Sequence, residues 1–270
     1  MIRLNTRDTI RKVKKIISSH DKVVVAFSGG VDSSLLLKLA VEALGRKNVI
    51  PVIGVSALYP EIEIKLAGKI AKACRVPLRI VKTDELKNRR FRKNPRNRCY
   101  ICKKYLFIAL LNIAKQNNCS GVIEGSNRDD LDDFRPGMKA VRELHIQSPF
   151  LEARVGKDEI RKAAKALGLS VWDKPSFACL ASRFPYGEML NDKTLKMIQK
   201  GEAYLRKLGF AQVRIRTHNT VARIEVESKE IPRLSNERIR TKVCVYLRKI
   251  GYTYVCVDLR GFRSGSMNEV

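Results

Sequence analysis

Short runs of β-branched and other apolar residues alternate with amphipathic segments along the first 170 or so residues, and this alternation restricts the fold more than any other feature. The first run, KVVVAF at 22–27, is continuous and is followed by Ser-Gly-Gly, as is typical of a strand buried in a parallel sheet. Similar runs lie at 48–56, 77–83 and 119–125, and ELHIQSPF at 143–150 suggests a further strand.

Segments with apolar residues at helical spacing separate these runs. They predict helices at 7–19, 31–44, 61–74, 100–116 and 157–167. Strands and helices in this rhythm predict an α/β fold with a doubly wound parallel sheet, in which ligands bind at the carboxyl ends of the strands.

The alternation breaks at a segment that contains Pro and Ser, 172–187. The patterns beyond it predict a smaller α+β arrangement, with a helix at 192–208, paired strands at 211–217 and 220–227, helical residues to 250 and a strand at 252–259. We therefore expect one α/β domain over 1–175. Residues 176–270 are expected to form a linker that carries Cys179 and a small α+β domain for substrate binding or oligomerisation.

The charge of the chain points to anionic partners. Fifty-four Lys and Arg residues against 27 Asp and Glu give a net charge of +27, which favours nucleotides, nucleic acid or other polyanions but does not choose among them. The sequence contains no apolar run of the roughly 18 residues that a membrane span needs and has no secretion signal. We expect a cytoplasmic protein whose seven cysteines are reduced thiols or metal ligands.

The string SGGVDSS at 28–34 follows the first strand and opens a helix, which is the context of a phosphate-binding loop. Glycines let the backbone approach a phosphate, and the amides of the first helical turn point toward it. Asp32 is placed to hold Mg²⁺ near the phosphates. No Gly-Lys-Ser/Thr follows, so this is not the loop of kinases and GTPases. The expected ATP-binding residues are Ser28, Gly29, Gly30, Val31, Asp32, Ser33 and Ser34.

Two thiols lie about one helical turn apart in RCYICKK at 98–104. Cys99 and Cys102 can reach the same metal, and neighbouring cations together with the helix N-terminus favour thiolates. Cys179, in an irregular segment flanked by prolines, is the best candidate for a third ligand, and three thiolates can hold a four-iron, four-sulfur cluster with one iron left open. The remaining thiols fall on apolar faces and are expected in the core, namely Cys74, Cys119, Cys244 and Cys256.

The phosphate loop resembles the signature of the PP-loop ATP pyrophosphatases, which cleave ATP between the α and β phosphates and adenylate an acyl or carbonyl oxygen. Over nearly its whole length the chain resembles one branch of that superfamily, the LarE sulfur transferases of nickel-pincer nucleotide biosynthesis. The resemblance rests on SGGVDSS at 28–34, NRCYICKKYLF at 97–107, EGSNRDDLDDFRPGMKA at 124–140, SPFLEARVGKDEIR at 148–161, KPSFACLASRFPYG at 174–187 and DLRGFRSGSMN at 258–268.

The resemblance implies a PP-loop adenylation domain over 1–175 and a specific reaction. The carboxylates of pyridinium-3,5-biscarboxylic acid mononucleotide would be adenylated with ATP and Mg²⁺ and then converted to thiocarboxylates. Some members of the family consume the sulfur of one cysteine, which matches Cys179 here. Others bind a [4Fe-4S] cluster through three cysteines, and Cys99, Cys102 and Cys179 match that type. The resemblance also suggests a homo-oligomer, possibly a hexamer, and other enzymes of the same biosynthesis as partners.

Several polar residues suit a dianionic nucleotide substrate. Arg183 beside Cys179, together with Arg214 and Arg216, offers planar donors for phosphate or carboxylate, and Ser182 is expected to orient the acyl-adenylate. Acidic residues in NRDDLDDFRP suit magnesium or ribose contacts, namely Asp129, Asp130 and Asp133.

Two other classes of protein remain as alternatives. A cluster-dependent tRNA thiolase also fits a CxxC pair, a distant cysteine and a basic chain, and it would bind tRNA in a salt-sensitive way. A basic module that binds nucleotides or nucleic acid without catalysis would bind ATP and release no pyrophosphate. The specific segments named above favour the sulfur transferase over both.

Overall fold

The structure is a computed structural model that describes residues 5–131, 135–175, 178–263 and 266–268. The chain forms two compact units, one of Met1–Glu85 with Asn97–Phe177 and one of Leu86–Arg96 with Ala178–Val270.

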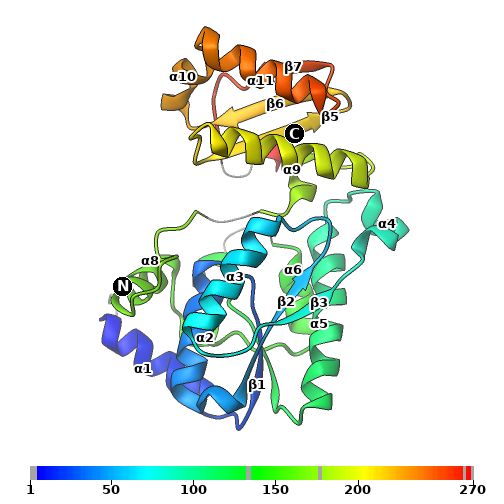
Figure 1. Ribbon diagram of the computed structural model, residues 1–270. Helices are drawn as coiled ribbons and strands as arrows, with labels where there is room; N and C mark the ends of the chain where they lie inside the picture. The colour runs from blue at the N-terminus through cyan, green and yellow to red at the C-terminus, as the bar shows by residue number, and fades with distance from the viewer. Residues whose placement is uncertain (1–4, 132–134, 176–177, 264–265, 269–270) are drawn as a thin grey trace. The chain divides into compact units, whose positions relative to one another are not determined.

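The first unit is built on a four-stranded sheet in which every pair of neighbours is parallel, in the order β3-β2-β1-β4 (Figure 1). Its strands are β1 (Val23–Ala26), β2 (Val49–Val55), β3 (Arg79–Lys82) and β4 (Gly121–Ile123). Its helices are α1 (Thr6–Ile17), α2 (Val31–Leu44), α3 (Glu61–Ala73), α5 (Arg98–Gln116), α6 (Gly137–Glu143), α7 (Pro149–Glu152) and α8 (Lys157–Ala166).

Alternate residues of the central strand β1 face opposite sides of this sheet. Val23 and Val25 pack into an apolar cluster with α1, α2, α3 and α8, whereas Val24 packs into a second cluster with α5 and α6. Both faces are therefore covered by helices, as in a doubly wound fold. The strand order changes direction between β1 and β4, and ligands bind at such a point in open α/β sheets.

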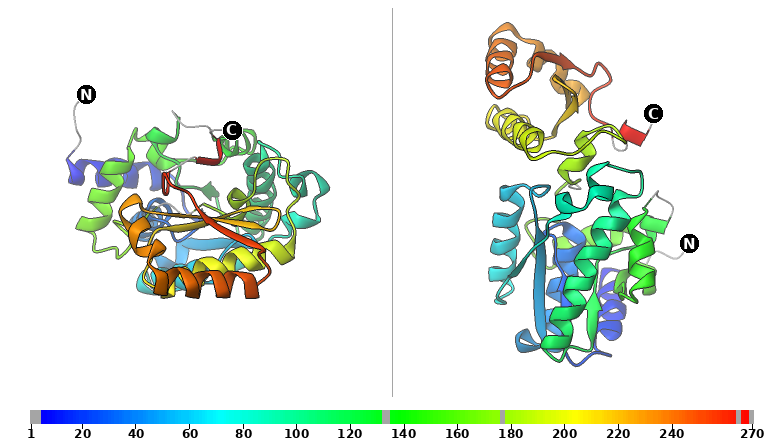
Figure 2. Two further views of the ribbon diagram at one scale, coloured as in Figure 1. Left: turned by 90° about the horizontal axis from the view of Figure 1, so that it is seen from above. Right: turned by 90° about the vertical axis from the view of Figure 1, so that its right-hand side faces the viewer.

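The second unit contains a three-stranded sheet in the order β5-β6-β7, with β5 (Val213–His218) antiparallel to β6 (Val221–Val226) and β7 (Tyr254–Val257) parallel to β6. Both views of Figure 2 place α9 (Asp192–Lys207) and α11 (Glu237–Lys249) on the same side of these strands, where their apolar residues form one cluster with the sheet. The remaining helices are α4 (Arg89–Arg92) and α10 (Ile231–Ser235).

The basic segment around α4 packs with the second unit, although the sequence analysis assigned all of 1–175 to the first domain. Asn94 is fully buried and donates from Nδ2 to the carbonyl of Pro185 at 2.7 Å, and Phe91 is buried beside it. The backbone amides of Gly187 and Leu190 donate to carbonyls of the same segment.

The sequence-predicted fold class is confirmed, but the strand expected at 143–150 is wrong. Glu143 ends α6, Gln147 makes only an isolated bridge to Ile123 of β4, and α7 begins at Pro149. Proline has no backbone N–H and readily occupies the first helical position, so it ends any extended pairing there. Within the described residues, no helix is long and apolar enough to span a membrane.

Candidate active site

The phosphate loop joins β1 to α2 at the carboxyl end of the central strand. Gly29 has a left-handed backbone with φ +72°, and a Cβ atom there would lie 3.1 Å from the Cβ of Ala67. Gly30 is the N-cap of α2, so Val31 and Asp32 begin the helix. The loop therefore presents backbone amides and the positive end of a 14-residue helix at the sheet edge.

Hydroxyl groups hold the loop in this shape. Ser33 Oγ accepts from the backbone amide of Ser28 at 3.1 Å and lies 3.0 Å from Ser28 Oγ. The Tyr59 hydroxyl donates to the Ser28 carbonyl. Ser34 is fully buried, and among the described residues its hydroxyl has no hydrogen-bond partner. The structure thus places all seven predicted ATP-binding residues in one turn and the helix start that follows it.

Asp32 contacts two segments that are distant in sequence. The Asn127 side chain donates to Asp32 Oδ1 at 3.3 Å, and the Lys157 ammonium donates to Oδ2. The side chains of Lys157 and Asp32 are 27% and 24% exposed, so this ion pair remains accessible to a ligand. Lys157 belongs to a segment that carried the family resemblance, but nothing in the pattern of that segment marked it as a neighbour of Asp32.

The acidic loop after β4 supports this arrangement. Asp129 accepts from the backbone amide of Lys157 at 2.8 Å, and Asp130 accepts from the amide of Asn127 at 3.0 Å and from Arg135 at 2.9 Å. Burial raises the pKa of Asp130. Both carboxylates thus fix the residues that contact Asp32, whereas Asp133 lies outside the described residues.

Glu124 anchors the start of the same loop at the end of β4. This buried carboxylate accepts from the backbone amide and hydroxyl of Ser126, each at 2.9 Å, and from the hydroxyl of Ser148 at 2.5 Å. Lys103 of α5 forms an ion pair with it at 3.5 Å. The helix that carries the cysteine pair is therefore tied to the loop beside Asp32.

Cys99 and Cys102 lie on the first turn of α5. Cys99 is exposed and Cys102 is half-buried, with its Sγ donating to Glu85 Oε1 at 3.4 Å. Cys179 is half-buried and precedes a 3₁₀ turn, Leu180–Arg183, in the second unit. Among the residues that the structure describes, no three His, Cys, Asp or Glu side chains gather as a metal site.

Arg183 is completely buried and organises the turn after Cys179. Its Nε and Nη2 donate to Glu202 at 2.7 and 3.1 Å, and its Nη1 donates to the carbonyl of Ala178 at 2.8 Å and to Ser182 Oγ at 2.9 Å. The hydroxyl of Ser182 donates to the Cys179 carbonyl at 2.9 Å. The contacts of Arg183 therefore hold the backbone that presents Cys179.

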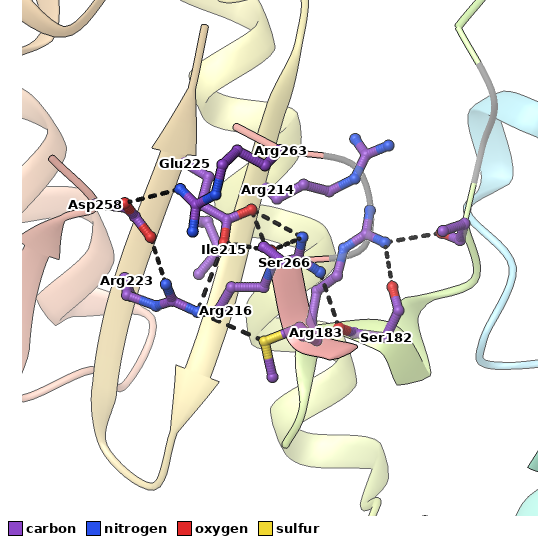
Figure 3. Close-up of polar contacts among 12 residues, drawn as sticks. Ser182, Arg183, Arg214, Ile215, Arg216, Arg223, Glu225, Asp258, Arg263 and Ser266 are labelled. Carbon is purple, nitrogen blue, oxygen red and sulfur yellow. Dashed lines mark hydrogen bonds and ion pairs between the residues drawn. The ribbon is translucent and has the colours of Figure 1, made fainter. Parts of the chain in front are cut away.

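Arg214 and Arg216 lie on the face of β5 opposite the apolar cluster that contains Val213 and Ile215 (Figure 3). Arg216 donates twice to Glu225 of β6, at 3.0 and 2.8 Å, and once to the Ser182 carbonyl at 2.9 Å.

Arg214 lies 5.3 Å from the ring centroid of Phe262. Burial, followed by the charge of Arg183, lowers the pKa of Arg214 to about 10, so it remains a cation at neutral pH. The structure brings Ser182, Arg183, Arg214 and Arg216 together in the second unit.

The other thiols differ from expectation at one position. Cys74 is buried and Cys119 and Cys244 are half-buried, but Cys256 is exposed. Its neighbours in β7, Val255 and Val257, pack against the core, so Cys256 faces the opposite side of the sheet.

Comparison with known proteins places these features in a family. The NAD synthase family model matches residues 5–106, which include the phosphate loop. The chain is 38% identical to the pyridinium-3,5-bisthiocarboxylic acid mononucleotide synthase of Lactiplantibacillus plantarum, over 92% of this chain and 89% of that protein. The chain belongs to the LarE family.

Two further relatives match this LarE protein over most of its length. An uncharacterised protein of Synechocystis is 37% identical over 97% of both chains, and one of Methanocaldococcus jannaschii is 31% identical over 91% of this chain and 92% of its own. This LarE protein is an ATP-dependent PP-loop enzyme of the sulfurtransferase class, as the sequence predicted.

Proposed function

We propose that this LarE protein adenylates the carboxylates of pyridinium-3,5-biscarboxylic acid mononucleotide and converts them to thiocarboxylates. The observation that carries the proposal is the phosphate loop with a partly exposed Asp32 at the helix start, in a chain that also holds the three thiols Cys99, Cys102 and Cys179. The name of the relative from Lactiplantibacillus plantarum supports the choice of substrate.

The first half of the reaction makes the carboxylate reactive. A substrate carboxylate oxygen bonds to the α phosphorus of ATP, and pyrophosphate leaves. The amides of Gly29 and Gly30 and the start of α2 would bind the phosphates. The carboxylate of Asp32 suits Mg²⁺, which prefers oxygen ligands and bridges phosphates, and its 24% exposure leaves it accessible. AMP then provides the leaving group that a free carboxylate lacks.

The second half replaces AMP with sulfur, and the three cysteines are the residues suited to it. Their donor set consists entirely of thiols, the ligands that most iron-sulfur clusters use, and Cys99 is exposed. Held by Cys99, Cys102 and Cys179, a [4Fe-4S] cluster would have one iron without a protein ligand, where an additional sulfide can bind. Direct use of the Cys179 sulfur is the other route that this constellation allows.

Residues of the second unit would bind and orient the substrate. Five arginines lie near two labelled carboxylates, Glu225 and Asp258, in Figure 3: Arg183, Arg214, Arg216, Arg223 and Arg263. A third carboxylate, Glu202, pairs with Arg183. The surplus of positive charge suits the phosphate of a mononucleotide, with Arg214 and Arg216 as ligands. Because it is fully buried, Arg183 acts as a positioning residue for Cys179 and Ser182.

The test begins with iron and acid-labile sulfide content, measured with the visible spectrum on protein purified without oxygen. Cys99→Ala, Cys102→Ala and Cys179→Ala should each lose the cluster. Cys256→Ala, which removes an exposed thiol outside the trio, should keep it. About four irons per chain support the cluster route, whereas no iron in protein that still transfers sulfur identifies Cys179 as a consumed donor.

The same variants test the order of the two half-reactions. Cys179→Ala should still release pyrophosphate from ATP in the presence of the pyridinium substrate but form no thiocarboxylate. Unchanged sulfur transfer by this variant would remove Cys179 from the site. Wild-type protein that thiolates tRNA and leaves the pyridinium substrate unchanged would contradict the proposed substrate.

A further inference from the structure

Helices α9 and α11 of the second unit expose many cations on their outer side. Their apolar residues pack on one face of the β5-β6-β7 sheet, opposite the face that carries Arg214 and Arg216 (Figure 2). We call the following exposed cations the basic surface: Lys193, Lys196, Lys200 and Lys207 of α9 with Arg238, Lys242 and Lys249 of α11. This surface is therefore separate from the arginines that would bind the substrate.

The spacing of these cations places them in one stripe along each helix. In α9 they follow one another at intervals of three, four and seven residues, and in α11 at intervals of four and seven. Such intervals keep side chains on one side of a helix with about 3.6 residues per turn. At about 1.5 Å per residue, the stripes are about 21 Å and about 16 Å long.

No acidic side chain neutralises the stripes within the part of the chain that the structure describes. The exposed acidic residues of these helices, Asp192 and Glu237, lie in the first turns, where the helix dipole stabilises them. Glu202 of α9 is buried and pairs with Arg183 and Arg206. Like charges three or four residues apart on a helix repel each other, so the stripes weaken the helices that carry them unless an anion binds there.

Two stacked tyrosines hold the stripes side by side. The ring centroids of Tyr204 in α9 and Tyr246 in α11 are 4.0 Å apart, with an angle of 13° between the ring planes. A Cβ atom at Gly201 of α9 would lie 2.9 Å from the Leu247 side chain of α11, so the two helices are in close contact. Packed helices lie about 8–10 Å apart, a distance between the widths of the minor groove, about 6 Å, and the major groove, about 12 Å, of DNA.

We propose that the basic surface binds the phosphate backbone of a double-stranded nucleic acid. Each strand of B-DNA carries one phosphate per about 3.4 Å of helix axis, so a stripe of about 21 Å spans about six phosphates. The two stripes can face the two backbones that border one groove. Lys and Arg contacts to phosphates supply affinity without reading the sequence of bases. This binding does not depend on the proposed sulfur transfer.

The composition of the surface favours nucleic acid over a protein or a membrane. Protein interfaces are depleted of lysine and depend on buried aromatic or apolar anchors. A helix that enters a membrane surface needs apolar residues beside its cations. In α9 and α11 the apolar residues face the sheet, and among the described residues Val245 is the one large apolar side chain that either helix exposes. Phosphate contacts need no such apolar area.

The test removes three cations from the stripes in the variant Lys196→Gln/Lys200→Gln/Lys242→Gln. The control removes the same charge from the first unit, in Lys65→Gln/Lys69→Gln/Lys72→Gln, where three exposed lysines lie on one face of α3. Fluorescence anisotropy measures binding to labelled duplexes of about 20 base pairs, one of DNA and one of RNA, between about 50 and 200 mM salt. Circular dichroism verifies that both variants keep the wild-type fold.

The wild type should bind a duplex with an affinity that falls steeply as salt rises. The variant of α9 and α11 should bind more than about tenfold more weakly, and its plot of log K against log salt should be shallower by about 3, because each lost phosphate contact removes about 0.9 from the slope. The control should keep the wild-type slope. The DNA and RNA duplexes show which double helix the surface prefers.

Three results would overturn the inference. Wild-type protein that binds neither duplex would have no such surface. Equal losses of slope in the two variants would assign binding to the net charge of the chain. Binding to phosphatidylserine vesicles, lost in the variant of α9 and α11 and without any affinity for the duplexes, would assign the basic surface to an anionic membrane.

Discussion

The two units of this LarE protein use charged residues in different ways. At the phosphate loop of the first unit, the side chains of Lys157 and Asp32 are 27% and 24% exposed. In the second unit, Arg183 and Glu202 are 0% and 1% exposed, and Arg216 and Glu225 are 6% and 0% exposed. The first pair can exchange its partners for ligands at little cost. The two pairs of the second unit are buried, so the fold itself orients Arg183 and Arg216.

This difference shows that a cluster of arginines in a sequence does not have to be a ligand-binding site, because buried arginines also serve the fold. A buried guanidinium must be satisfied by the protein itself, because an unpaired charge away from water is strongly unfavourable. Arg183 meets this demand with Glu202, two backbone carbonyls and Ser182. Arg183 therefore affects Cys179 by holding the turn in place. We expect the removal of Arg183 to lower the stability of the second unit.

The largest effect is therefore expected from Arg183→Met. It leaves Glu202 buried without its main partner, which should lower the free energy of unfolding of the second unit by about 3–5 kcal/mol. Denaturant unfolding followed by circular dichroism measures this. Arg206→Ala is the control, since Arg206 contacts the same carboxylate but is 28% exposed, and it should cost about 0–1 kcal/mol. If the two variants lost the same free energy of unfolding, burial would not explain how much each arginine contributes to stability.

Acid should weaken the second unit by a related mechanism. Burial opposes the charged form of Glu202, but Arg183, Arg206 and Arg214 outweigh it and hold the pKa of this carboxyl below its ordinary value of 4.5. Because the folded pKa is the lower one, the stabilisation is complete above about pH 4.5 and is lost as the pH falls through the folded pKa.

The size of the loss is set by how far the folded pKa of Glu202 lies below its ordinary value. Unfolding free energies measured between pH 7 and pH 3 should therefore fall less steeply in Glu202→Gln than in the wild type. Parallel pH profiles for the two proteins would assign the acid sensitivity to other carboxyl groups.

Much of the fold could be predicted because local patterns and tertiary packing agree. The β-branched run at 22–27 becomes β1, and its alternating residues fill the clusters on both sides of the sheet. The segment 143–150 failed because its apolar residues fit a strand locally, while only Gln147 finds a partner there. A strand at 143–150 would have to pair with β4, and a local sequence pattern holds no information about that partner.

The candidate site was also only partly predictable from the sequence. SGGVDSS marks the phosphate loop because glycine, serine and aspartate are needed there at adjacent positions. Lys157 carries no local signal, since its partner Asp32 is brought to it only by the assembled first unit. The burial of Arg214 and Arg216 likewise follows from the register of β5 against β6, which sets Arg214 opposite Glu225.

A smaller effect on stability is expected from Gly29→Ala. An L residue with φ near +72° costs about 1–2 kcal/mol, and the added Cβ would also press on Ala67 at 3.1 Å. Gly168→Ala is matched in backbone, with φ +70°, but has nothing within 4 Å of the added atom. Both variants should lose stability, and only Gly29→Ala should also weaken ATP binding in calorimetry. If both variants lost ATP affinity, the shape of the phosphate loop would not be the cause of the loss.

The smallest change in stability is expected from Lys157→Met. An ion pair that is about one-quarter exposed on both sides contributes about 0–1 kcal/mol, because water competes for both charges. Chemical unfolding should therefore detect little difference from the wild type. A loss of stability comparable to that of Arg183→Met would mean that Lys157 and Asp32 are as important for folding as the buried pair of Arg183 and Glu202. A small loss would instead show that this partly exposed pair contributes little to the fold of the first unit, in contrast to the buried pair of Arg183 and Glu202.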